Sequence, residues 1–318
     1  MRIRSRVALL LALAAATASA QTSSGGVTRI VVPFAAGGVQ DILARAIGSE
    51  LGTAIARSVI VENRPGAGGT IGTAMVAKSQ PDGHTLVLAA ASHTINGSLH
   101  AKLPYDPIRD FSGVAHIGTV EYVLMINPRI PANTVGEFVA YAKANPGKLN
   151  YSTAGSGTAT HLSMAYLAAL AGIDMVQVPF KGTNEAVNEV LAGRADAVIA
   201  ANIGALAFVK DARIRMLGVT SAKRSKFLPE LPTVAEGVPG YEFDSWLGLL
   251  GPAGIPAATV DQLNLAVAAL LRDPVILDRL AKQGIEPQAL SPQAFDALLR
   301  ADFARMARVV KASGARVE

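Results

Sequence analysis

The chain contains no cysteine among its 318 residues. This absence excludes disulfides, thiol nucleophiles and thiolate metal sites. About 300 residues can bury a large core without disulfides, so the lack of cysteine is compatible with export. Aromatic residues make up only 5% of the chain while 50% of it is hydrophobic, so Ala, Val, Leu and Ile must form most of the core.

Charged residues are also sparse, at 17%. Lys and Arg are scattered, without the dense basic stripe and interleaved aromatics of a nucleic-acid-binding surface. The sequence has no Gly-x-Ser-x-Gly and no His-Glu-x-x-His motif. Ser156 and His161 are close enough in sequence to suggest a nucleophile and a base, but no third group accompanies them. We therefore expect neither enzyme activity, nor a metal, nor a cofactor.

The N-terminus has the three parts of a secretory signal. Arg2, Arg4 and Arg6 are followed by an apolar run over 7–16 and then by Ala18-Ser19-Ala20. The run is much shorter than the ~20 residues of a membrane span, which is the alternative interpretation. We predict a signal peptide over 1–20, cleaved after Ala20, and a periplasmic protein. Its removal lowers the basic residues from 29 to 26 against 24 acidic ones, a net charge near +2.

Short apolar segments alternate with helical patterns. Residues 30–33, 58–62 and 85–90 have the composition of buried strands, and apolar residues at helical spacing fill 39–51 between the first two. The same alternation recurs over 149–220, and the last third is helical. Capping residues predict helix starts at Thr134, Thr259, Asp273 and Ser291. Strand–helix–strand order predicts parallel pairing in an α/β fold.

Length suggests two domains, yet no linker rich in Gly, Ser or Pro divides the chain. We therefore expect two α/β lobes joined by strands that cross between them, at 116–127 and 243–252. One lobe would comprise 27–120 plus 246–318, and the other 121–245. Trp246, the only tryptophan, would lie in a crossing strand, where a core role and a ligand contact are both open.

Four segments after predicted strands are rich in small residues and hydroxyls. They are 33–38, 91–94, 152–158 and 179–183. Open parallel sheets bind ligands beyond the carboxyl ends of their strands, and free N–H groups at helix starts favour anions. Ser92, Ser152, Ser156, Thr158 and Thr183 could add hydroxyl donors. The segments together predict a site that holds a carboxylate through neutral donors.

These segments also resemble a known family. Its motifs appear in order as Pro33-Phe34-Ala35-Ala36-Gly37-Gly38 with Asp41, 61–69, Pro81-Asp82-Gly83, 103–107, Ala154-Gly155-Ser156-Gly157-Thr158 with His161, 178–182, 219–221, 231–233 and 251–254. Over essentially the whole mature chain the sequence resembles the periplasmic solute receptors of tripartite tricarboxylate transporters, called the Bug family.

The resemblance implies a type II periplasmic-binding-protein fold, with the ligand in a cleft between the lobes. It also implies that a membrane permease receives a carboxylate-bearing solute from the protein, which we expect to be a monomer. The ligand-binding residues it implies are Phe34, Ala35, Ala36, Gly37, Gly38, Ser92, Ser152, Ala154, Gly155, Ser156, Gly157, Thr158, His161 and Asp196. Asp196 would either accept a hydrogen bond from the ligand or face solvent.

Two residues depart from the family pattern. Phe180 stands where many relatives have Tyr, and His84 follows Pro-Asp-Gly where Tyr is usual. Both bear on ligand choice rather than on class. A sensor or orphan receptor without its own permease, an exported α/β hydrolase and a structural envelope protein remain alternative functions.

Overall fold

The computed structural model describes residues 26–202, 208 and 211–315. The predicted signal peptide therefore lies outside the described residues. Within them, no helix combines the length and the apolar character that crossing a membrane requires.

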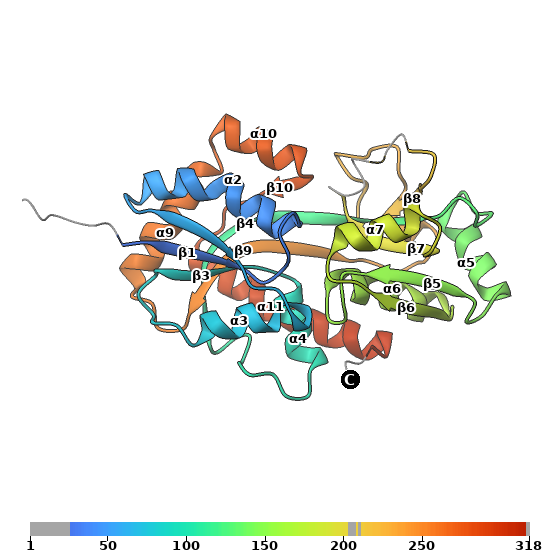
Figure 1. The fold of residues 1–318 in the computed structure, drawn as a ribbon, viewed down its shortest axis with the longest axis horizontal. Coiled ribbons are helices and arrows are strands. Elements are labelled where there is room, and N and C mark those ends of the chain that lie inside the picture. The colour runs from blue at the N-terminus through green and yellow to red at the C-terminus, as the bar shows by residue number, and fades with distance from the viewer. Residues whose placement is uncertain (1–25, 203–207, 209–210, 316–318) are drawn as a thin grey trace, which may run out of the picture.

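One mixed sheet runs through the described part of the chain (Figure 1). Its strands are β1 (Thr28–Val32), β2 (Val59–Asn63), β3 (Thr85–Ala90), β4 (Phe111–Ile126), β5 (Leu149–Thr153), β6 (Met175–Pro179), β7 (Ala197–Ala201), β8 (Arg215–Val219), β9 (Asp244–Pro252) and β10 (Ile285–Pro287). The main order is β2-β1-β3-β9-β4-β7-β5-β6, and β8 and β10 both pair with β4. β1 is parallel to β2 and β3, and β5 is parallel to β6 and β7, whereas β9 is antiparallel to β3 and β4.

Helices cover both parts of this sheet. They are α2 (Val39–Ala54), α3 (Thr70–Ala77), α4 (Ser92–Leu99), α5 (Val135–Ala144), α6 (Ala159–Ala171), α7 (Thr183–Leu191), α9 (Ala257–Leu270), α10 (Pro274–Lys282) and α11 (Pro292–Ser313), with short 3₁₀ turns η2 (Ala67–Gly69) and η3 (Val234–Glu236). Strand–helix–strand units dominate each part, as the sequence predicts.

The molecule has two lobes joined by crossing strands, which confirms the predicted fold class. β1, β2 and β3 lie in one lobe, β5, β6 and β7 lie in the other, and β4 and β9 run between them (Figure 1). The first part of β4 pairs with β9, and its last five residues pair with β7. The residue boundaries of the lobes stay a prediction.

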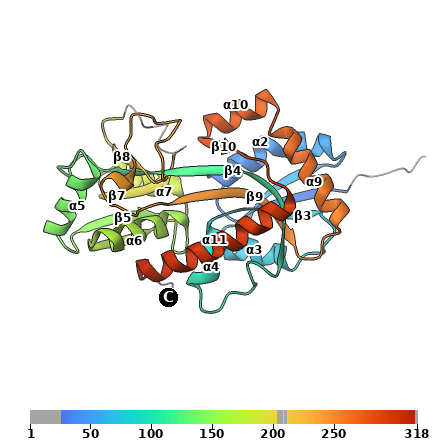
Figure 2. The same ribbon diagram turned by 180° about the vertical axis from the view of Figure 1, so that it is seen from behind.

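The C-terminal helix α11 also connects the lobes. It packs against α4 on one side and α6 on the other, along the face seen in Figure 2. A proline at its first position fixes a helical φ, and the Ser291 side chain caps it by accepting the Ala294 N–H at 3.2 Å.

Most predicted helix starts agree with the structure. Asp273 and Ser291 are N-caps followed by proline, and Thr134 accepts the Glu137 N–H. The capping box at Thr259 is wrong: Pro256 is the N-cap of α9 and the helix begins at Ala257, so Thr259 lies within its first turn. The segment 91–94, expected as a loop, contains the first turn of α4.

Trp246 belongs to the core. It is 3% exposed, packs edge-on against Phe295, and donates from Nε1 to Oδ2 of Asp302 at 2.8 Å. The same carboxylate oxygen accepts from Thr94 Oγ1 at 2.6 Å. Buried polar groups are costly unless they are paired, so this network fixes α11 against β9 and α4.

Candidate functional site

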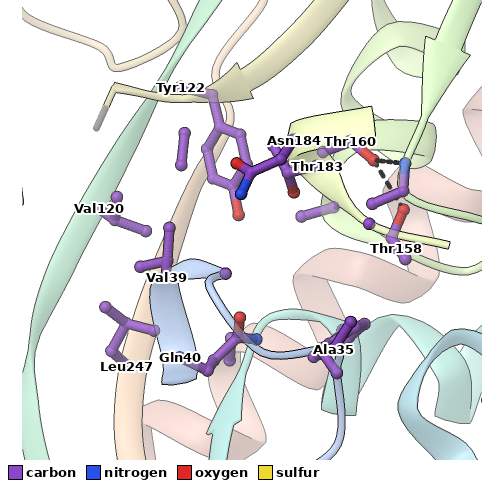
Figure 3. Close-up of a pocket in the computed structure, with 18 of the residues that line it drawn as sticks. Ala35, Val39, Gln40, Val120, Tyr122, Thr158, Thr160, Thr183, Asn184 and Leu247 are labelled. Carbon is purple, nitrogen blue, oxygen red and sulfur yellow. Dashed lines mark hydrogen bonds between the residues drawn. The ribbon is translucent and has the colours of Figure 1, made fainter. Parts of the chain in front are cut away.

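A pocket of about 190 Å³ lies between the lobes. Its walls come from the loop after β1, the starts of α2, α4, α6 and α7, and the crossing strands β4 and β9 (Figure 3). The lining residues are Phe34, Ala35, Ala36, Gly38, Val39, Gln40, Ala90, Ser92, Val120, Tyr122, Ala154, Thr158, Ala159, Thr160, Gly182, Thr183, Asn184, Glu185, Ala201 and Leu247. The pocket therefore occupies the position expected for a ligand of a two-lobed receptor.

Hydrogen bonds from side chains outside the pocket lining hold the loop between β1 and α2 in place. Asp41 Oδ2 accepts the Gly37 N–H at 2.9 Å, and Asn63 Nδ2 donates to the Phe34 carbonyl at 3.1 Å. Arg45 connects the two anchors, donating to Asp41 Oδ1 at 3.0 Å and to Asn63 Oδ1 at 3.1 Å. These bonds fix the loop backbone before any ligand enters.

Asp41 stays ionised in this network. Burial opposes its charge, but hydrogen bonds from Arg45, Gly37 and Asn63 outweigh burial and hold the pKa of the carboxyl below its usual value. The charge serves the loop and its arginine rather than the pocket, because Asp41 is absent from the lining.

Four helices begin at the pocket, and two of them have a glycine N-cap. Gly38 precedes α2 and Gly182 precedes α7, and neither offers a side chain to the first N–H groups of its helix. Those groups carry the positive end of the helix dipole and need an acceptor. Facing starts of this kind suit an anion without requiring a basic side chain.

The start of α6 is organised differently, because its hydroxyls are already engaged. Thr158 Oγ1 donates to the Gly155 carbonyl at 2.6 Å and lies 2.8 Å from Thr160 Oγ1, which accepts the Ala154 N–H at 2.8 Å. Each hydroxyl has one hydrogen to donate. Thr158 donates its hydrogen to the Gly155 carbonyl, and Thr160 donates its hydrogen to Thr158 Oγ1. The hydroxyls therefore shape the loop, and Thr158 Oγ1 caps α6 by accepting the His161 N–H at 3.4 Å. This leaves the N–H groups of the lining residues Ala159 and Thr160 as donors.

Seven predicted ligand-binding residues line the pocket: Phe34, Ala35, Ala36, Gly38, Ser92, Ala154 and Thr158. The structure places the other seven outside the lining. Gly37 and Gly155 lie next to lining residues. Ser152 is buried and donates to the Ala186 carbonyl at 2.7 Å. Ser156 and Gly157 lie against the η2 turn of the opposite lobe, where the space beside Gly68 is bounded by the Ser156 carbonyl.

His161 also lies outside the pocket lining. Its Nδ1 accepts the Gly157 N–H at 3.3 Å, and burial lowers the pKa of the ring to about 4. The ring is therefore neutral at physiological pH and cannot supply a positive charge. Ser156 approaches the Gln177 amide at 3.5 Å instead, so among the described residues no serine–histidine hydrogen bond forms here.

Asp196 lies away from the pocket. It accepts from Arg129 Nη2 at 2.7 Å and from the Asn150 N–H at 2.8 Å, and its side chain is nearly buried. These partners give it a role in fixing the start of β7 to β5. Phe180 is also outside the lining and packs into the core cluster around Val123 and Val187.

The sequence analysis missed the pocket residues on the strands. Val120 and Tyr122 of β4 and Leu247 of β9 line it, as do Val39, Gln40 and Asn184 at helix starts. Val39 and Asn184 directly follow segments that were chosen, so extending each segment by a turn would have found them. Val120 and Tyr122 are two apart and face the same side of their strand, but β4 is buried on both faces, so the period alone does not show which face meets the pocket.

Burial raises the pKa of Tyr122 to about 12, so its hydroxyl stays neutral. Figure 3 shows this hydroxyl pointing into the pocket. The carboxylate of Glu185, the one acidic side chain among the described lining residues, accepts the Lys181 N–H at 3.0 Å, just before its own helix begins.

Two lobes, crossing strands and an interlobe pocket define a solute-binding protein of the periplasmic-binding-protein class. Solved structures agree over nearly the whole chain. The periplasmic binding protein BugD matches with a TM-score of 0.86 at 32% identity, covering 93% of this chain and 100% of its own. The Rhodopseudomonas palustris protein Rpa4515 with adipate matches with a TM-score of 0.87 at 34% identity, covering 92% and 99%. MatC from the same organism with bound malate matches with a TM-score of 0.83 at 30% identity, covering 91% and 100%.

The family model described as the tripartite tricarboxylate transporter family receptor matches residues 43–315. The chain belongs to this family, which confirms the resemblance to the Bug receptors.

Proposed function

We propose that this chain is an extracytoplasmic receptor that binds a small carboxylate in the interlobe pocket and delivers it to a tripartite tricarboxylate-type permease. The observation that carries the proposal is the convergence of four helix starts on one pocket, two of them with glycine N-caps. Neutral N–H donors and helix dipoles stabilise a carboxylate there. The adipate and malate held by two relatives are carboxylates as well.

Binding can be tested by thermal shift and calorimetry with mono-, di- and tricarboxylates. A ligand at about 100 times its Kd should raise the free energy of unfolding by about 2.7 kcal/mol. Recovery of the ligand chemically unchanged after incubation separates a receptor from a hydrolase. Stabilisation by sugars or cations, with none by carboxylates, would contradict the proposal.

A point variant tests the site directly. Ala36→Asp places a negative charge beside the start of α2, where it suits the helix but occupies the position proposed for the anion. Ala257→Asp, at the exposed first residue of α9, is the matched control. We expect Ala36→Asp to abolish carboxylate binding while both variants keep their folded stability. Equal affinity in the two variants would place the ligand elsewhere.

Export and delivery need tests in cells. Mass spectrometry of the protein from a periplasmic fraction should show a chain that begins at Gln21, after cleavage at Ala20. Deleting the gene should abolish uptake of the solute that the purified receptor binds. Uptake that survives deletion would favour the sensor or orphan receptor.

A further inference from the structure

The two ends of the pocket differ in chemistry. Val39, Val120 and Leu247 gather at one end, whereas Ala35, Thr158 and Thr160 lie at the other, as Figure 3 shows. At the first end the side chains offer methyl groups from α2, β4 and β9. At the second end the loop after β1 and the start of α6 offer backbone N–H groups.

The apolar end is built into the core. Val120 is 2% exposed and Leu247 is 1% exposed, and both belong to the hydrophobic cluster that runs through the two lobes. Val39 packs against the same cluster. These side chains are held on two strands and a helix, so this wall of the pocket cannot easily turn a polar group toward the ligand.

The charges around the pocket agree with this difference between its two ends. No Lys, Arg or His side chain lines the pocket in the part of the chain that the structure describes. Beyond the first N–H groups of α2, an anionic group at the apolar end would meet only methyl groups after losing its water, and burying a poorly paired charge is strongly unfavourable. The polar groups nearest the middle, Tyr122 and Gln40, are neutral.

The volume limits the ligand. A cavity of about 190 Å³ admits only a small molecule. Once one carboxylate lies at the polar end, the rest of the ligand fills the space between that end and the three aliphatic side chains.

We infer that the pocket selects a monocarboxylate with an apolar body, and that Val39, Val120 and Leu247 determine this specificity. The inference rests on the proposed carboxylate-receptor function and sharpens it. The carboxylate binds at the helix starts, and the aliphatic or aromatic body packs against the apolar end. Di- and tricarboxylates are disfavoured because their second charge reaches that end.

Hexanoate and adipate are a suitable pair of probes, because they share a six-carbon chain and differ by one carboxylate. Benzoate and isophthalate are the aromatic equivalents. Calorimetry on the full mature chain should give at least a 100-fold lower Kd for each monocarboxylate, since an unpaired buried charge costs several kcal/mol and 1.4 kcal/mol is tenfold.

Variants at Val39 test the residues themselves. Val39→Thr should weaken hexanoate binding about five- to tenfold, because a hydroxyl replaces a methyl that would contact the body of the ligand. Val275→Thr is the matched control, since Val275 is exposed near the start of α10 and should bind hexanoate as the unmodified protein does. Val39→Lys should reverse the preference by at least tenfold toward adipate. Thermal melts without ligand verify that each variant is folded.

The outcomes separate this inference from the function on which it rests. Tighter binding of adipate, isophthalate or citrate than of the matched monocarboxylates would overturn the inference and leave the receptor function standing. No binding of any mono-, di- or tricarboxylate would refute both. An unchanged preference in a folded Val39→Lys protein would also overturn the assignment of the apolar end.

Discussion

Alanine at Gly68 should hold the two lobes apart. Gly68 lies in η2, next to α3 and α4 of one lobe, and a Cβ built there would lie 2.6 Å from the carbonyl oxygen of Ser156 in the loop between β5 and α6 of the other. Contacts under 3.0 Å essentially never occur for a real Cβ, and here the neighbour is backbone. The lobes must move to admit the methyl group.

The magnitude follows from two separate costs. Gly68 has a φ of 63°, and a residue with a side chain there loses about 1–2 kcal/mol of folding free energy. The overpacking at the interlobe contact costs about a further 1–3 kcal/mol. We expect this second cost to fall on the form in which the lobes touch, which a ligand between them favours, so it should reduce ligand affinity by roughly 5- to 150-fold.

Gly172→Ala is the matched control. Gly172 ends α6 with a φ of 61°, yet nothing lies within 4 Å of a Cβ there. Urea unfolding without ligand should therefore show a loss of about 1–2 kcal/mol that both variants share. Calorimetry with the tightest-binding carboxylate should show weakened binding in Gly68→Ala only. Equal affinities in the two variants would refute the argument that this contact belongs to the ligand-bound form.

Three further predictions concern pH and the buried polar networks. Burial lowers the pKa of His93 and of His161 to about 4 in the folded protein. In the unfolded chain these histidines take up protons near pH 6.5. The free energy of unfolding is therefore full above about pH 6.5 and falls as the pH drops toward 4, by up to about 1.4 kcal/mol per pH unit for each histidine. Urea titrations across this range check the slope, and a flat profile would contradict it. Asp41→Ala removes the acceptor of the Gly37 N–H and should weaken carboxylate binding about tenfold or more, as calorimetry would show, whereas unchanged affinity would mean that the loop needs no anchor. Trp246→Phe leaves the buried Asp302 with one hydrogen-bond donor fewer and should lower the free energy of unfolding by about 1–3 kcal/mol, as measured by denaturant unfolding. A loss below about 0.5 kcal/mol, the size expected for a surface substitution, would argue against the network.

Much of the fold could be predicted because local patterns determine it. Buried parallel strands are continuous apolar runs, and the run over 85–90 coincides with β3. Asp273 and Ser291 mark helix starts because a short polar side chain followed by proline fits few other structures. The pairing of strands far apart in the sequence could not be predicted in this way. β9 inserts between β3 and β4, and the sequence contains no local signal for which strands it joins.

The candidate site divides in the same way. Loop residues such as Ala35 and Thr158 could be predicted because small residues at a helix start let a ligand approach its free N–H groups. Tyr122 and Leu247 could not, because β4 and β9 are buried on both faces and only the tertiary structure decides which face meets the pocket. Asp196 shows the converse, since an acidic residue near a strand start serves Arg129 and Asn150.

The change of partner along β4 has a mechanical consequence. Glu121 is the last residue paired with β9, opposite Asp244, and Tyr122 is the first paired with β7, opposite Ala201. The strand is continuous across this change of partner, so we expect the hinge between the lobes to lie between these two residues and β4 to bend there when the lobes rotate. Tyr122 also lines the pocket. A solute bound in this pocket would therefore contact the hinge itself, and we expect its binding to stiffen the hinge directly rather than through the distant edges of the lobes.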